Sequence, residues 1–313
     1  MRLALLADVH DNLPALEAVV EDIDRRGVDG VIAAGDYLVR GPFPLETMRL
    51  LRSLNAWMIR GNTEGYVLDY DAGRAPVPWY TSDQWAGLRW TCEHVDRESL
   101  DFIEDLPEQR VVALDGFAPI RVVHGTPRDP LGRLIPDGDP ESVRWFRQAG
   151  FLSQDDDPPG LTTAFAQIDE PVLVCGHTHI PWTEEEKGRL ACNPGAVSGA
   201  LNGDPRAQYA LLTWCDGRWQ VEHRAVAYDV GRLRRAFHDR GLLAEGGPFA
   251  RAYLLSVETG RNVVGRLFWH LDRLVHEGGH EDWVVVPETI WERAVSTFPW
   301  EDYAHRPRRL SVA

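Results

Sequence analysis

The sequence predicts an α/β protein with parallel strands in its first sheet. Near the N-terminus, short apolar runs of strand length alternate with longer segments that carry apolar residues at helical spacing. Such βαβαβ alternation places parallel strands side by side in a sheet covered by helices. A second observation concerns the strand ends, where Asp, Asn or His follows one apolar run after another. Ligand sites in α/β sheets form just beyond the carboxyl ends of strands.

The individual elements follow from the same patterns. We expect strands over 2–8, 30–36 and 56–62, and helices over 13–27 and 44–54. From Glu64 to Pro107 the alternation breaks: the sequence predicts a loop over 70–80 and then two helices.

Strands return in the second half of the chain. Five apolar runs are expected as strands: 119–125, 171–177, 188–195, 208–215 and 218–226. Asp216-Gly217 separates the last two and predicts a β-hairpin. After Tyr228 the composition favours helices, and one stripe is expected as core: Val263, Val264, Leu267, Phe268, Leu271, Leu274 and Val275. We therefore expect a domain over 1–228, with a helical insert at about 65–110, and a mainly helical extension over 229–313.

Composition excludes several classes of function. The 313 residues carry a net charge of −15, which argues against non-specific binding of nucleic acid. The sequence has no apolar run of about 18 residues and only a short apolar start, so neither a membrane span nor a signal peptide is expected. The four cysteines are widely spaced and indicate reduced thiols in a cytoplasmic protein. The twelve Trp residues are interpreted mainly as packing residues, and a substrate-stacking Trp cannot be located.

The polar residues at the strand ends form a candidate metal-binding set. Each is common at turns when taken alone, and a single His after a strand is usually structural. Together they comprise Asp8, His10, Asp36, Asn62, His124, His177 and His179. Seven nitrogen and oxygen donors are too many for one ion but suit two ions that share a carboxylate. Such mixtures favour Mn, Fe, Co, Ni or Zn over Ca or Mg, and two metals can hold a phosphoryl group between them.

Several motifs resemble one known family. Asp8-x-His10, Gly35-Asp36, Gly61-Asn62, His124-Gly125 and Gly176-His177-Thr178-His179 are similar to the motifs of calcineurin-like metallophosphoesterases, in particular the bacterial phosphodiesterase-like branch. The resemblance implies a four-layer αββα sandwich with a dinuclear site, most simply two Mn²⁺ ions, with Fe, Ni, Co or Zn as alternatives.

The resemblance also implies a role for each ligand. Asp8, His10 and His179 would hold the first metal. Asn62, His124 and His177 would hold the second, with Asp36 as the bridge. Asn12 is expected to support His10 or its loop, and Asn193 to stabilise a turn.

Two positions depart from the family pattern. Thr63 stands where the family usually has a His that protonates the leaving oxygen or steadies the phosphate. Val39 stands where the protein-phosphatase branch has an Asp that supports this His, whereas Arg40 keeps a phosphate-gripping Arg. A buried Asp at position 39 would be a poorly paired charge without a His at position 63. The absence of both residues together is therefore physically consistent. Arg40, Asn62 and Thr63 are therefore the candidate catalytic residues.

The expected function is hydrolysis of a small phosphoester or nucleotide-like substrate, in particular a phosphodiester, by hydroxide that the metals activate. The alternatives are a phosphomonoesterase, a dinucleoside-polyphosphate hydrolase and a protein phosphatase. A fourth alternative is a non-catalytic scaffold with the same fold. Seven histidines outside the motifs could supply a proton in place of position 63, but none has local support: His94, His223, His238, His270, His276, His280 and His305.

Overall fold

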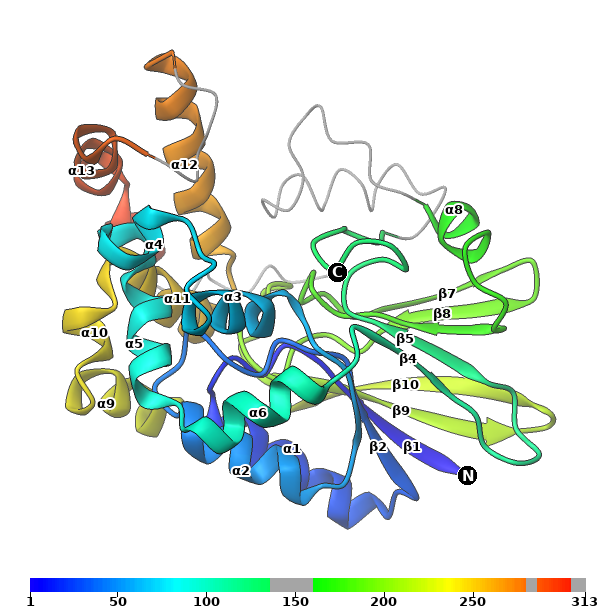
Figure 1. Cartoon of the computed structure of the whole chain (residues 1–313). Coiled ribbons are helices and arrows are strands. Elements are labelled where there is room, and N and C mark those ends of the chain that lie inside the picture. Colours follow the sequence, from blue (N-terminus) through cyan, green and yellow to red (C-terminus); the bar gives the residue numbers. More distant parts are fainter. Residues whose placement is uncertain (136–159, 280–285, 305–313) are drawn as a thin grey trace, which may run out of the picture.

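The computed structural model describes residues 1–135, 160–279 and 286–304, and Figure 1 shows its two face-to-face β-sheets with helices on their outer sides. This is the αββα sandwich that the sequence predicts. In the part of the chain described, no helix has the length and hydrophobicity needed to cross a membrane.

The first sheet contains the predicted βαβαβ unit and the predicted hairpin. Its spatial order is β10 (Arg218–Val226), β9 (Ala207–Cys215), β1 (Arg2–Leu6), β2 (Gly30–Ala33) and β3 (Trp57–Met58). β1, β2 and β3 are parallel, and β9 pairs with β1 and β10 in antiparallel fashion. The hairpin turns at Asp216-Gly217, whose φ angles of 51° and 79° suit a tight two-residue turn.

The second sheet has a parallel centre and antiparallel edges. Its order is β4 (Gln109–Val112), β5 (Ile120–Val123), β6 (Val172–Val174), β8 (Arg189–Asn193) and β7 (Trp182–Glu186). β5, β6 and β8 run parallel, whereas β4 and β7 pair antiparallel at the two edges. In each sheet, the carboxyl ends of several parallel strands therefore lie at the same edge, where the connecting loops begin.

Strand alternation builds the core on both faces of the first sheet. Leu3 and Leu5 lie in a buried cluster with Val122 of the second sheet. Ala4 and Leu6 point to the opposite face and join the cluster formed with helices α1 (Leu13–Arg26) and α2 (Pro44–Ser53). On the outer face of the second sheet, α8 (Leu161–Phe165) packs against residues of β5, β6 and β8. Period-two burial therefore fixes all four layers.

Two groups of helices gather near the carboxyl end of β1 (Figure 1). The first group contains α3 (Asn62–Asp71), α4 (Val77–Thr81), η1 (Asp83–Trp85), α5 (Ala86–His94) and α6 (Arg97–Asp105). The second contains α9 (Val230–Asp239), α10 (Leu242–Glu245), α11 (Gly247–Thr259), α12 (Val263–Glu277), α13 (Glu288–Thr297) and η2 (Trp300–Tyr303). Trp90 of α5 shares a buried cluster with Phe237 and Tyr253, so the two groups pack against each other.

Three local expectations are corrected. The loop expected over 70–80 contains the end of α3 and most of α4. The strand expected over 56–62 is paired only at Trp57–Met58, because helix α3 already begins at Asn62. In the stripe of α12, most residues are buried in core, but Val264 and Phe268 are half-buried and line a cavity.

Candidate metal centre and adjoining cavity

The structure brings all seven predicted ligands together at the strand ends. Asp8 and His10 follow β1, Asp36 follows β2, and Asn62 opens α3 after β3. From the second sheet, His124 follows β5, while His177 and His179 follow β6. The donor atoms form two groups, each with its atoms within 4.8 Å of one another: Asp8, His10 and His179 in one, and Asp36, His124 and His177 in the other.

In the first group, two imidazole lone pairs face each other. The Nδ1 atom of His10 lies 3.2 Å from the Val39 carbonyl oxygen, and that of His179 lies 2.9 Å from the Gly199 carbonyl oxygen. A carbonyl only accepts hydrogen bonds, so both Nδ1 atoms carry the proton and both Nε2 atoms are bare. These Nε2 atoms are 3.1 Å apart. Such an arrangement fits a cation that both nitrogens bind.

The second group repeats the pattern. His124 donates from Nδ1 to the Ala34 carbonyl oxygen at 2.7 Å. Its Nε2 then faces two acceptors, Asn62 Oδ1 at 3.1 Å and Asp36 Oδ1 at 3.3 Å, so this nitrogen is positioned either to donate a proton to them or to share a cation with them. The other Asp36 oxygen lies 3.7 Å from His10 Nε2. Asp36 therefore directs one carboxylate oxygen toward each group, which is the geometry a shared ligand requires.

Burial and mutual charge set the protonation of this cluster. Burial lowers the pKa of His10 to about 3 and, together with the nearby His124, that of His177 to about 3. Burial also lowers the pKa of His124, but the Asp36 carboxylate outweighs it and raises the value to about 9. Burial raises the pKa of Asp8 to about 8. A metal ion held by these residues would supply positive charge to the cluster without a proton.

Backbone strain is concentrated at the ligand positions. Positive φ angles, which L-residues rarely adopt, occur at Asp8 (56°), His10 (47°), Asp36 (57°), His177 (67°) and His179 (58°). Val39, at 67°, is the more unusual because its side chain is β-branched. Strain of this kind costs about 1–3 kcal/mol per residue and clusters at functional sites.

Close backbone approach requires glycine beside Asp36. A Cβ atom at Gly61 would lie 2.2 Å from Asp36 Oδ1, and one at Gly35 would lie 2.5 Å from the Gly61 nitrogen. The space that these glycines leave also lets the Thr63 N–H, at the N-terminus of α3, donate to Asp36 Oδ1 at 2.9 Å. The helix terminus thus holds the carboxylate in place.

Glu64 is a buried residue that the sequence interpretation missed. Its Oε2 atom accepts hydrogen bonds from the N–H groups of Asp36 (2.9 Å) and Gly61 (2.8 Å). Its Oε1 atom accepts from the N–H groups of Tyr37 (2.8 Å) and Leu38 (3.1 Å). One carboxylate therefore joins the loop after β2 to the start of α3. The available signal was a Glu at the third helical position, as in a capping box.

Asn12 and Asn193 lie where the sequence analysis expects supporting residues. Asn12 caps α1 by accepting from the Ala15 N–H at 3.1 Å and donates to Ser198 Oγ at 2.8 Å. Asn193 donates to the Gly176 carbonyl oxygen at 2.7 Å, in the loop that carries His177. Both side chains therefore connect loops around the ligands.

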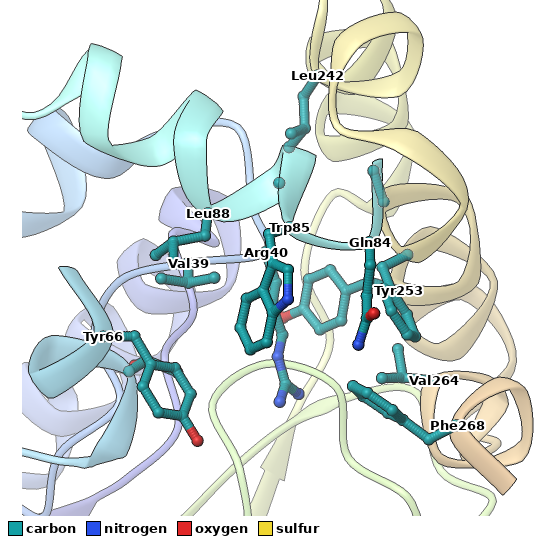
Figure 2. Close-up of a pocket in the computed structure, with 14 residues that line it drawn as sticks. Val39, Arg40, Tyr66, Gln84, Trp85, Leu88, Leu242, Tyr253, Val264 and Phe268 are labelled. Atoms are coloured by element: carbon teal, nitrogen blue, oxygen red, sulfur yellow. The ribbon is translucent and has the colours of Figure 1, made fainter. Parts of the chain in front are cut away.

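A cavity adjoins the ligands, and Figure 2 shows the side chains around it. Arg40 and Thr63 both line it. The Thr63 hydroxyl donates to Glu64 Oε1 at 3.3 Å rather than toward the cavity. The Arg40 guanidinium lies 5.9 Å from the centre of the Tyr253 ring, and among the described residues it has no carboxylate partner within 4.0 Å.

None of the other histidines that the structure describes lines this cavity. His94 stacks on Trp90, His223 contacts Thr183, and His270 contacts Thr297. His276 pairs with Asp272, and His238 lies beside a different pocket, whereas His280 and His305 fall outside the described residues. Among the described residues, no histidine outside the ligand set is therefore placed to replace the missing His at position 63.

Comparison with known proteins identifies the class. Residues 1–217 match the model of the calcineurin-like phosphoesterase superfamily domain, so the chain belongs to this superfamily. It is a hydrolase that acts on phosphate esters, and its superfamily uses divalent metals.

Particular relatives extend this result. The chain is 27% identical over 213 residues to phosphodiesterase YfcE of Escherichia coli, a match that covers 68% of this chain and 87% of the relative. It is 26% identical over 247 residues to an uncharacterized protein of Methanocaldococcus jannaschii, covering 73% and 88% of the two chains. A metallophosphoesterase structure from Sphaerobacter thermophilus has 26% identity and a TM-score of 0.61, and the match covers 83% of this chain and 99% of that chain.

Proposed function

We propose that the chain is a phosphodiesterase with a dinuclear metal centre, and that Mn²⁺ is its preferred metal. Asp8, His10 and His179 would hold one ion. Asn62, His124 and His177 would hold the other, with Asp36 between them. The observation that carries the proposal is the convergence of bare donor atoms, above all the two Nε2 atoms 3.1 Å apart in the first group. The similarity to a relative named as a phosphodiesterase supports the substrate class.

Two divalent ions in such a site polarise phosphoryl oxygens and lower the pKa of water. The protein supplies the remaining functions. The carbonyl groups behind His10, His124 and His179 fix the imidazole tautomers. The strained loops and the N-terminus of α3 hold the carboxylates, and Arg40 of the cavity lining would bind a phosphate oxygen.

The charge of the cavity favours a diester over other phosphate substrates. Among the described lining residues, Arg40 alone carries a formal charge. A phosphodiester has one negative charge, whereas a monoester or a polyphosphate has more. A Mn²⁺-loaded enzyme should therefore hydrolyse an aryl diester faster than the matching monoester or a dinucleoside polyphosphate. A clear preference for the monoester at all pH values would contradict this assignment.

Arg40→Ala should weaken catalysis and inhibition by phosphate. Loss of a charged hydrogen bond costs about 1–3 kcal/mol, or about 5- to 150-fold. Arg40→Lys should recover part of the loss, because it keeps the charge but not the bidentate geometry. The measurements are kcat/KM for an aryl diester and the inhibition constant of phosphate.

Arg60→Ala provides the matched control for Arg40. Arg60 follows β3 and does not line the cavity. Its side chain pairs with the exposed Glu108 at 3.7 Å. We expect its replacement to change kcat/KM by less than about twofold, as for a surface ion pair. Equal effects of the two substitutions on kcat/KM would show that Arg40 does not bind the phosphate.

The rate should depend strongly on the leaving group. With Thr63 in place of a His, the reaction lacks the family's proton donor, so esters with basic leaving groups should react slowly. Rates for substituted phenyl diesters should fall steeply as the pKa of the phenol rises. Thr63→His should reduce this slope in part, and Thr63→His with Val39→Asp should reduce it further, since both positions line the same cavity. A slope near zero, with chemistry rate-limiting, would mean that another acid already acts.

A further inference from the structure

The cavity beside the metal ligands has the walls of an aromatic binding pocket. It has an empty volume of about 720 Å³, which includes space open to solvent. Five aromatic side chains line it: Tyr66, Trp85, Phe249, Tyr253 and Phe268. Leu88, Leu242 and Val264 complete the apolar wall, and Gln84 adds an amide.

The pocket is formed between the two groups of helices. Tyr66 comes from α3 and Trp85 from η1, whereas Phe249 and Tyr253 come from α11 and Phe268 from α12. Trp85 is held by stacking on Trp79, with ring centres 4.2 Å apart, and Phe268 packs on Phe249 at 4.4 Å. These ring contacts help to fix the two side chains in the wall of the cavity (Figure 2).

The pocket lies beside the metal ligands and includes the proposed phosphate-binding residue. Arg40 and Thr63 belong to its lining. Tyr253 packs edge-on against the His10 ring, with ring centres 6.0 Å apart. Tyr66 lies one helical turn after Asn62 and contacts its side chain. In Figure 2, Tyr66 and Phe268 lie on opposite sides of the Arg40 guanidinium. A ligand with its phosphate at Arg40 would extend its ester group between these rings.

We propose that this pocket binds the nucleobase of a nucleoside phosphodiester. The proposal rests on the phosphodiesterase function and specifies its substrate class. Aromatic side chains stack on bases of any sequence. The single described charge in the lining, Arg40, suits the one negative charge of the diester. An acyl chain would use the apolar wall but would gain nothing from stacking on the aromatic rings.

The proposal is tested with esters that share one leaving group. The substrates are thymidine 5′-p-nitrophenyl phosphate, ethyl p-nitrophenyl phosphate and dodecyl p-nitrophenyl phosphate, each with the Mn²⁺-loaded protein. Because p-nitrophenolate leaves in every case, differences in kcat/KM report how the retained group binds. We expect the thymidine ester to exceed the ethyl ester by about 10-fold or more, the scale of base–aromatic stacking.

Variants of the pocket should remove this preference. Phe268→Ala and Trp85→Ala should each lower kcat/KM for the thymidine ester by about 10-fold, on the stacking scale, and for the ethyl ester by less than about twofold. Phe268→Tyr keeps the ring and should retain the preference for the thymidine ester. The comparison of Phe268→Ala with Phe268→Tyr still tests the pocket if Trp85→Ala fails to fold. The neighbouring Trp269→Ala is the control, since Trp269 does not line the cavity. Equal rates for the thymidine and ethyl esters, or a higher rate for the dodecyl ester, would overturn the proposal.

Calorimetry separates failure of the pocket from failure of the proposed activity. Thymidine 5′-monophosphate should bind the Mn²⁺-loaded protein at least about 10-fold more tightly than ethyl phosphate, and Phe268→Ala should abolish the difference. If no ester is hydrolysed but this difference is present, the pocket proposal stands and the phosphodiesterase function fails. If all esters are hydrolysed at equal rates and both phosphates bind equally, the phosphodiesterase function stands and the pocket proposal fails.

Discussion

Asp36→Asn should abolish binding of one metal equivalent and reduce diester hydrolysis by more than about 100-fold, because even partners outside the metal ligands typically contribute 10- to 100-fold. The two Asp36 oxygens face different histidines, His124 at 3.3 Å and His10 at 3.7 Å. An amide would keep one acceptor but place an NH₂ group opposite the other ring. That donor would satisfy a bare Nε2 without a metal, and the negative charge between the two ions would be lost.

The measurement is elemental analysis after saturation with Mn²⁺, together with kcat/KM for an aryl diester. Wild-type protein should approach two equivalents and the variant one or fewer. Asp24→Asn, an exposed change on α1, serves as the control and should leave both values unaltered. If the wild type stays at one equivalent in saturating metal, or if the variant keeps two, Asp36 is not a bridge between two ions.

The sequence could predict the ligands because each follows a strongly apolar strand. The apolar runs stop at or just before Asp8, Asp36 and His124, which places these residues at strand ends regardless of tertiary detail. The same reasoning failed at α3, where Asn62, Thr63 and Gly65 have low helix propensity. That helix is stabilised by its cap and by burial of Val67 and Leu68. Local propensity is a weak guide when tertiary contacts fix the element.

The edge strand β7 and the cavity lay beyond the sequence patterns for different reasons. β7 contains Glu184, Glu185 and Glu186, which have no strand signal of their own, and it forms because β8 pairs along its whole length. The rings of the cavity come from separate helices, and no local pattern distinguishes a cavity-lining Trp85 from a core Trp90. Only the packing of the C-terminal helices against the insert brings the rings together.

Glu64→Gln should destabilise the metal-free protein by about 2–6 kcal/mol, because two buried backbone N–H donors would lose their acceptor. The Glu64 carboxylate accepts from four backbone N–H groups, two at each oxygen. Glutamine has one acceptor oxygen, so its NH₂ group must face two of those N–H groups whichever way the amide turns. Two buried donors are then left without partners, and each costs about 1–3 kcal/mol.

The loss should also reach the metal centre, because the affected N–H groups belong to the loop that carries Asp36 and to the residue before Asn62. We therefore expect a lower urea midpoint without metal and a weaker affinity for Mn²⁺ by calorimetry. Glu21→Gln is the matched control: Glu21 is 71% exposed and pairs with Arg25 on α1. Its replacement should cost less than about 0.5 kcal/mol. Equal urea midpoints for the two variants would show that Glu64 does not hold these loops, and the position of Asp36 would then depend on the Thr63 N–H and the adjoining glycines alone.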